Sequence, residues 1–169
     1  VAERGTVAVK GDNVIVGIDL GTTNSLVAVC DARGPRVIPT TGGETLVPSA
    51  VRYERGSGAL RTVVGAIAKR EAPSYPRSTV LSVKRLMGRS AADAAPDLSY
   101  LSYAVKAGDR GNSRIELAWD GEERAVVSPE EVSAEILGAL RAQASGALGF
   151  DVTRAVVTVP AYFDDAQRQ

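Results

Sequence analysis

The sequence predicts an α/β fold, because a long helical segment lies between two strands of the apolar, buried type. The strands are expected over 14–20 and 154–159, and both are rich in β-branched residues. Nearly continuous apolar runs of this length are typical of strands that are covered on both faces. The helix is expected over about 128–149, where apolar residues recur at helical spacing.

The first strand continues into a predicted hairpin. Residues 21–24 (GTTN) are turn formers, and 25–30 (SLVAVC) form a second apolar run. A third strand is expected at 36–39. The tip of the hairpin is therefore placed at GTTN.

The middle of the chain, about 51–127, has a different character. A helix is expected over 62–70, and a helical or turn-like segment over 79–87, with Gly88 as its C-cap. The alternating residues 113–119 and their partner 124–127 predict a second hairpin.

The long helix has the clearest local signal in the chain. Ser128 is the expected N-cap, Pro129 the first helical residue and Glu131 the acidic member of a capping box. Asp164 and Gln167 resemble the start of a further helix, which we expect to be cut off at Gln169.

Composition excludes several functional classes. Lys and Arg together number 20, as do Asp and Glu, so the zero net charge gives no reason to expect a nucleic-acid or membrane partner. There is no histidine, which excludes histidine catalysis and histidine metal ligation. Cys30 is the only cysteine and is expected to be a buried structural thiol.

The hairpin tip is the first candidate for chemistry. Gly21 allows a phosphate to approach the backbone, and the hydroxyls of Thr22 and Thr23 and the amides through Asn24 can donate to its oxygens. Asp19, beside this turn, is placed to hold Mg²⁺ through its water shell. From the residues alone, a plain tight turn explains the pattern equally well.

Two other segments are less informative when taken alone. Lys84 and Arg85 form a basic pair that is more often a solvated helix face than a site. Residues 160–169 (PAYFDDAQRQ) read as a connection from strand to helix, and Asp164 and Asp165 are neighbours that face different directions, so they are not an acid–base pair.

Taken together, the segments resemble the heat shock 70 chaperone family of the DnaK/HscA type. The motifs that carry the resemblance are 17–25 (GIDLGTTNS), 84–89 (KRLMGR) and 159–169 (VPAYFDDAQRQ), with 44–49 (ETLVPS) as a weaker match. They occur in the family's order and cover about 14–169. The first motif also resembles sugar kinases of the same superfamily.

The resemblance implies a role for each matching residue. Gly21, Thr22, Thr23 and Asn24 would bind the β- and γ-phosphates of ATP or ADP, and Asp19 would hold the waters of Mg²⁺, with K⁺ as a further candidate ion. Lys84 would be catalytic and contact the γ-phosphate. Two further matching positions, Pro160 and Arg168, would relay the nucleotide state between domains.

The same resemblance implies the fold and its organisation. It is the actin-like (ribonuclease H-like) ATPase fold, of which this chain would be the first lobe only, an N-terminal part of the nucleotide-binding domain. Residues 1–13 would be a leader, 14–50 and 128–169 the larger subdomain, and 51–127 an inserted smaller one. The chain alone is expected to be inactive, marginally stable and prone to self-association.

The implied function is that of a cytoplasmic ATP-dependent chaperone. Its partners would be unfolded or client polypeptides, a J-domain co-chaperone and a nucleotide exchange factor. Residues 86–90 (LMGRS) and the Asp164–Asp165 pair favour the HscA type, which serves iron–sulfur cluster assembly. Two alternatives stay open: an actin-like sugar or acid kinase, and a non-catalytic binding module.

Overall fold

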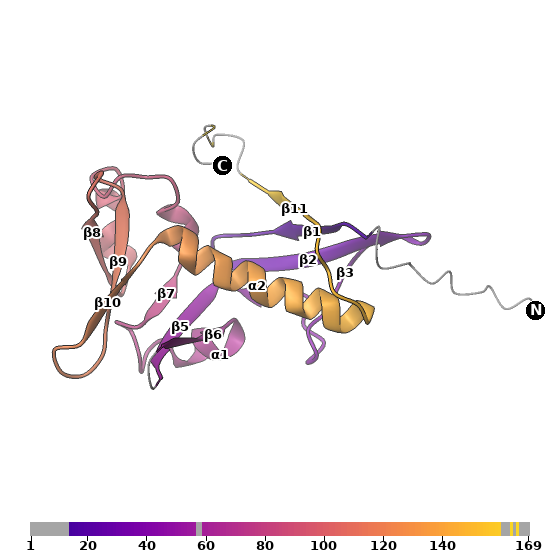
Figure 1. The fold of residues 1–169 in the computed structure, drawn as a ribbon, viewed down its shortest axis with the longest axis horizontal. Helices are drawn as coiled ribbons and strands as arrows, with labels where there is room; N and C mark the ends of the chain where they lie inside the picture. The colour runs from indigo at the N-terminus through magenta and orange to yellow at the C-terminus, as the bar shows by residue number, and fades with distance from the viewer. Residues whose placement is uncertain (1–13, 57–58, 160–162, 164, 166–169) are drawn as a thin grey trace, which may run out of the picture.

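Three β-sheets and one long helix form most of the structure, a computed structural model that describes residues 14–56, 59–159, 163 and 165 (Figure 1). The strands are β1 (Val16–Asp19), β2 (Asn24–Asp31), β3 (Gly34–Val37), β4 (Val47–Pro48), β5 (Ala50–Arg55), β6 (Leu60–Val64), β7 (Thr79–Leu81), β8 (Ala104–Ala107), β9 (Ser113–Ala118), β10 (Arg124–Val127) and β11 (Ala155–Thr158). The helices are α1 (Ala66–Glu71), α2 (Pro129–Leu148) and the 3₁₀ segments η2 (Val83–Arg85) and η3 (Ala95–Tyr100).

The largest sheet joins the two ends of the described chain. It has five strands in the order β11-β1-β2-β3, with β4 paired to β2. Strands β1 and β2 are antiparallel, as the predicted hairpin requires, whereas β1 and β11 are parallel. The middle of the chain, from β5 to β10, forms two antiparallel sheets of three strands each, β6-β5-β7 and β10-β9-β8.

Helix α2 begins at the predicted capping box. The Glu131 amide donates to Ser128 Oγ at 3.0 Å, and the Ser128 amide donates to Glu131 Oε2 at 2.6 Å. Gly149, with φ 79°, ends the helix in the left-handed conformation that favours glycine. Both ends of the helix are therefore set by local sequence, as predicted.

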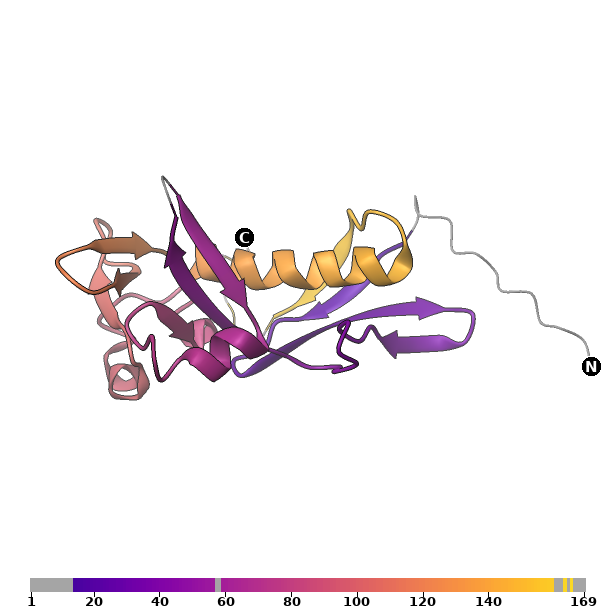
Figure 2. The same ribbon diagram turned by 90° about the horizontal axis from the view of Figure 1, so that it is seen from below.

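One face of α2 forms the centre of the core. Val132, Ile136, Leu140 and Ala144 are all fully buried. This face contacts β1 and β2 of the large sheet, β5 and β6 of the second sheet, β9 of the third, and η2. Figures 1 and 2 show the helix running lengthwise past these elements, so a single helix connects all three sheets.

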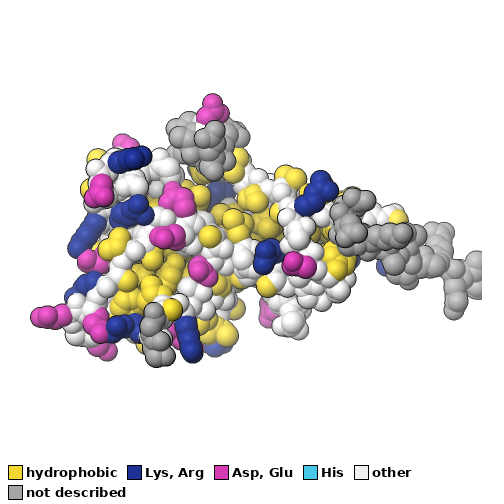
Figure 3. Space-filling view, in the orientation of Figure 1, with side chains coloured by type: hydrophobic (Ala, Val, Ile, Leu, Met, Phe, Trp, Pro, Cys, Tyr) yellow, Lys and Arg dark blue, Asp and Glu magenta, His cyan; other side chains and the backbone are white. Residues whose placement is uncertain are grey.

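The expectation that the two apolar strands are covered on both faces is wrong for this chain. Strand β1 is buried on one face only, because Val16 and Ile18 face α2 while the preceding Ile15 is 44% exposed. All of β11 is exposed, with Val156 at 62%. In Figure 3, hydrophobic side chains form exposed patches in the centre of this face, in the region of α2 and β11.

Cys30 is exposed, which corrects the prediction of a buried thiol. Side chains alternate along β2, so that Ser25, Val27 and Val29 face the core and the residues between them face outward. Cys30 follows the last inward position and is therefore on the solvent side.

Two helical expectations in the middle of the chain also needed correction. The segment predicted as a helix over 62–70 begins as strand β6, and α1 starts only after Gly65, whose φ is 86°. The β-branched residues of β6 pair with β5, and this tertiary pairing overrides the helical pattern. In the segment 79–87, strand β7 precedes the short η2.

Some features were not predicted, and others lie outside the described residues. Segments η3 and β8 had no clear sequence signal. The leader over 1–13 and the helix cap at Asp164 and Gln167 fall on residues that the structure does not describe. Within the described ranges, no helix is both long and apolar enough to cross a bilayer.

The exposed strand β11 leads to a prediction about self-association. Replacing Val156 with Lys places a charge on an uncharged strand edge, which disfavours pairing with a second strand. We expect static light scattering of the 169-residue chain to fall, while the free energy of unfolding changes by about 1 kcal/mol or less.

Val126→Lys is the matched control, because Val126 is similarly exposed at 57% and lies on the edge strand β10 of another sheet. An equal fall in scattering for both variants would show that β11 is not the strand responsible.

Candidate functional site

The tip of the β1–β2 hairpin is built around a glycine whose position leaves no room for a side chain. A Cβ atom at Gly21 would lie 2.0 Å from the backbone oxygen of Asn24, which is far inside van der Waals contact. The backbone therefore folds tightly back on itself at this point. The close approach seen here is within the chain, between Gly21 and Asn24, and the predicted approach of a phosphate stays a prediction.

Two buried serines, Ser25 and Ser49, hold the tip through hydrogen bonds to the backbone of Gly21. The Gly21 amide donates to Ser25 Oγ at 3.2 Å, Ser49 Oγ donates to the Gly21 carbonyl at 2.8 Å, and the two hydroxyl oxygens are 2.8 Å apart. Because the Ser49 proton is used on the carbonyl, the Ser25 hydroxyl is the donor between them. The Ser49 amide also donates to the Thr23 carbonyl at 2.9 Å.

This ring of hydrogen bonds fixes which groups at the tip remain available. The Gly21 amide is already bonded to Ser25, so it is not free to bind a ligand. Within the described part of the chain, the hydroxyls of Thr22 and Thr23 make no hydrogen bond, and both residues reach the surface. The tip thus presents two hydroxyl groups on a rigid turn.

Asp19 lies at the end of β1, next to the tip. Its Oδ1 accepts a hydrogen bond of 2.7 Å from the hydroxyl of Thr158, its partner residue in the parallel strand β11. The side chain is exposed, and Oδ2 has no partner among the described residues. An oriented carboxylate with one free oxygen fits the indirect binding of Mg²⁺ through water.

A direct protein cage for a metal is not formed by the described residues. They contain no group of three or more His, Cys, Asp or Glu side chains placed to hold an ion. The donor set therefore fits a cation that keeps most of its waters and takes its other ligands from a substrate.

Lys84 lies in η2, between the buried side chains of Val83 and Leu86. It is partly exposed and makes no hydrogen bond or ion pair with any described residue, the hairpin tip included. The turn and the hairpin are linked instead through α2, which contacts η2, β1 and β2. The structure does not join Lys84 directly to Thr22 and Thr23.

Two predicted residues, Pro160 and Arg168, lie outside the described residues. Sequence reasoning also missed the supporting roles of three residues: Ser25 and Ser49, which hold the tip, and Thr158, which binds Asp19. Ser49 lies in the ETLVPS segment, and that position was the only signal for it. Thr158 could not be found, because its contact with Asp19 depends on the register of two strands distant in sequence.

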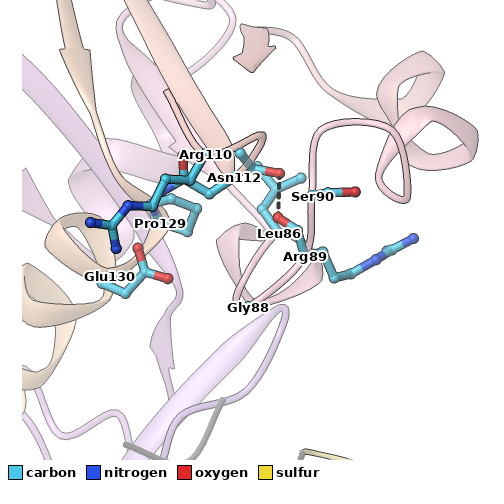
Figure 4. A pocket seen from close by; sticks show the side chains of 9 residues that line it. Leu86, Gly88, Arg89, Ser90, Arg110, Asn112, Pro129 and Glu130 are labelled. Carbon is cyan, nitrogen blue, oxygen red and sulfur yellow. Dashed lines mark hydrogen bonds between the residues drawn. The ribbon is translucent and has the colours of Figure 1, made fainter. Parts of the chain in front are cut away.

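A separate pocket of about 270 Å³ lies beyond the Lys84 turn, between Gly88 and the start of α2. Figure 4 shows Arg110 and Glu130 facing each other across it, while the Arg89 side chain points away. None of the predicted site residues that the structure describes lines this pocket. It is therefore distinct from the hairpin tip.

Comparison with known proteins identifies the family. The family model described as Hsp70 protein matches residues 15–169. The chain is 44% identical over 155 residues to chaperone protein dnaK of Cyanidioschyzon merolae, covering 92% of this chain and 24% of the relative. It is 43% identical over 157 residues to chaperone protein DnaK of Stenotrophomonas maltophilia, covering 92% and 23%. The chain belongs to the Hsp70 family.

Membership in the Hsp70 family confirms the predicted fold class. The chain has the α/β, actin-like ATPase fold of the family's nucleotide-binding domain, and its mixed sheets correspond to part of the first lobe. It spans about a quarter of the length of these curated relatives.

The geometry of the tip gives a direct stability prediction. Gly21→Ala forces the backbone of Asn24 to move and should lower the free energy of unfolding of the chain by about 2 kcal/mol. Urea denaturation of the 169-residue chain measures this.

Gly17→Ala is the matched control on the same hairpin, because nothing lies within 4 Å of a Cβ atom there. It should change the free energy of unfolding by about 0.5 kcal/mol or less. Equal effects of the two substitutions would contradict the packing that the structure gives to Gly21.

Proposed function

We propose that the Hsp70 protein containing this chain binds ATP at the β1–β2 hairpin tip and hydrolyses it, and that this cycle drives binding and release of unfolded or client polypeptides. The family is that of DnaK-like chaperones. The observation that carries the proposal to these residues is the tip itself, where Ser25 and Ser49 hold a tight turn with two outward hydroxyls.

In this proposal, Thr22 and Thr23 donate hydrogen bonds to the β- and γ-phosphates, with the backbone up to Asn24. A turn whose shape is already fixed loses little entropy when it binds an anion. Since the Gly21 amide is used within the turn, Gly21 contributes the tight fold of the tip and not a hydrogen bond to the phosphate.

Asp19 orients the water shell of Mg²⁺ through the oxygen that Thr158 leaves free. When bound, the metal neutralises charge on the phosphate oxygens. K⁺ is a further candidate ion.

Lys84 is proposed as the catalytic residue. Phosphoryl transfer depends mainly on positioning and on stabilising charge that develops on the transferred group. Lys84 has no hydrogen bond or ion pair with another described residue, so its charge is available for a phosphate. Lys84 would extend from η2 toward the γ-phosphate and the attacking water.

Several finer points belong to the same proposal. The larger subdomain would comprise 14–50 and 128–169, and the smaller subdomain 51–127. Pro160 and Arg168 would couple nucleotide state to the polypeptide-binding part. The partners would be a J-domain co-chaperone and a nucleotide exchange factor, in the cytoplasm. The HscA type, with its role in iron–sulfur cluster assembly, is favoured only by 86–90 and the Asp164–Asp165 pair.

The two alternative functions have less support. A sugar or acid kinase would share the first motif, but it would not need the segment 160–169, and the Hsp70 family model extends over residues 15–169. A non-catalytic binding module would not require Asp19 to be oriented beside the exposed hydroxyls of the tip.

The proposed role of Lys84 predicts a specific kinetic effect. In the full-length protein, Lys84→Ala should lower the single-turnover rate constant for hydrolysis by about a hundredfold or more. Calorimetric affinity for ATP should change much less, because the interaction strengthens as charge develops in the transition state.

Lys69→Ala is the control, since Lys69 is exposed in the last turn of α1. This substitution should leave both the single-turnover rate constant and the affinity for ATP unchanged. A loss of affinity with normal turnover of bound ATP in Lys84→Ala would make Lys84 a binding residue only.

A further inference from the structure

The turn that carries Lys84 is attached to η3 by one carboxylate. Asp97 Oδ1 accepts a hydrogen bond of 3.3 Å from Arg85 Nη1. Its Oδ2 accepts one of 2.7 Å from Arg89 Nη1. The two arginines lie on either side of the buried Leu86, and Arg85 comes directly after Lys84 in the chain. A single side chain therefore holds both ends of the segment 85–89.

Arg89 also closes this segment on itself. The same Nη1 donates to the Arg85 carbonyl at 3.1 Å, and Nη2 donates to the Asp93 carbonyl. Figure 4 shows that the Arg89 side chain extends away from Arg110 and Glu130. The side-chain nitrogens of Arg89 thus bind the turn and η3, although Arg89 is also among the residues that line the neighbouring pocket.

The turn has little internal stability without such contacts. Segment η2 is a 3₁₀ segment of three residues, closed by the Arg85 amide on the Ser82 carbonyl at 3.1 Å and the Leu86 amide on the Val83 carbonyl at 2.9 Å. Ser82, which precedes it, has φ 56° and ψ 29°, a left-handed conformation that is unfavourable for a residue with a Cβ. Short 3₁₀ turns of this kind depend on their surroundings.

Those surroundings act on two sides of the turn. On the inner side, Val83 and Leu86 are buried against the core, and Ser133 of α2 lies 3.2 Å from the Met87 sulfur. On the outer side, Asp97 is the only carboxylate in the described part of the chain that reaches Arg85 and Arg89. The Asp93 carboxylate is directed to Ser90 instead.

We propose that Asp97 is a positioning residue for Lys84, holding the outer side of the turn through Arg85 and Arg89 so that the lysine reaches its phosphate. This inference rests on the proposed function of Lys84. Because Lys84 has no polar partner of its own in the described structure, the direction of its side chain depends on the backbone that carries it.

The chemistry of Asp97 suits this role. The hydrogen bond from Arg89 holds the pKa of Asp97 below its usual value, so the carboxylate is ionised at neutral pH. Exposed ion pairs contribute little to global stability. Loss of the charge should therefore loosen the turn locally and leave the rest of the fold intact.

The experiment compares Asp97→Asn with Asp31→Asn in the full-length protein. Asp31 is a matched control, because its carboxylate binds Arg36 at 2.9 Å and is 18% exposed, against 21% for Asp97. It is the last residue of β2, accepts a hydrogen bond from the Arg33 amide and is distant in sequence from Lys84.

The first readout needs no nucleotide. Trypsin cleaves after Lys84 and Arg85 only when the turn opens, and such cleavage follows the population of the open form. Timed digestion with mass spectrometry should show these two cuts about tenfold faster in Asp97→Asn, and unchanged in Asp31→Asn.

The second readout is single-turnover hydrolysis with ATP affinity measured alongside. A misplaced catalytic group costs on the order of ten- to a hundredfold in rate, so Asp97→Asn should slow hydrolysis by this amount with affinity changed by less than about threefold. The double variant Lys84→Ala, Asp97→Asn should be no slower than Lys84→Ala alone, because Asp97 acts through Lys84. Asp97→Glu, which keeps the charge, should recover most of the rate.

Unchanged cleavage and hydrolysis in Asp97→Asn would overturn the proposal, as would a double variant that is much slower than Lys84→Ala. If Lys84→Ala itself hydrolyses ATP normally, the proposed function fails at this residue. Faster cleavage in Asp97→Asn would then still support the role of Asp97 in holding the turn through Arg85 and Arg89. Unchanged cleavage would reject that role.

Discussion

The buried face of α2 is the interaction on which the rest of the structure depends. Val132, Ile136, Leu140 and Ala144 present one apolar stripe, and strands of all three sheets as well as η2 pack on it. Burial of such side chains contributes about 1.5–3 kcal/mol each, far more than any surface ion pair in this chain. The helix therefore determines where the two halves of the candidate site lie.

This arrangement places the groups that are proposed to form one site on elements that pack on the same helix. Asp19 and the hairpin tip follow a strand that packs on α2, and Lys84 lies on a turn that packs near the N-terminus of the same helix. Since α2 is capped at both ends by local sequence, its length and position are well defined. A change within the stripe would displace both groups together.

The sequence predicted what local patterns specify. The capping box at Ser128 and the hairpin with its tip at Gly21 have signals within a few residues, and both are present as expected. Exposure was harder to predict. Whether Cys30 and β11 are exposed depends on which elements cover each face of the sheet. The contact of Thr158 with Asp19 depends on strand register, and no local pattern encodes it.

The two halves of the candidate site differ in how firmly they are held. The hairpin tip is fixed by buried hydroxyls that cannot exchange readily with water, because Ser25 and Ser49 are 1% and 3% exposed. The Lys84 turn is fixed on its outer side by ion pairs that water can reach. Exposed hydrogen bonds open at lower free energy than buried ones. If the tip binds phosphate as proposed, binding uses the rigid half, while the chemical step depends on a turn that can respond to its surroundings.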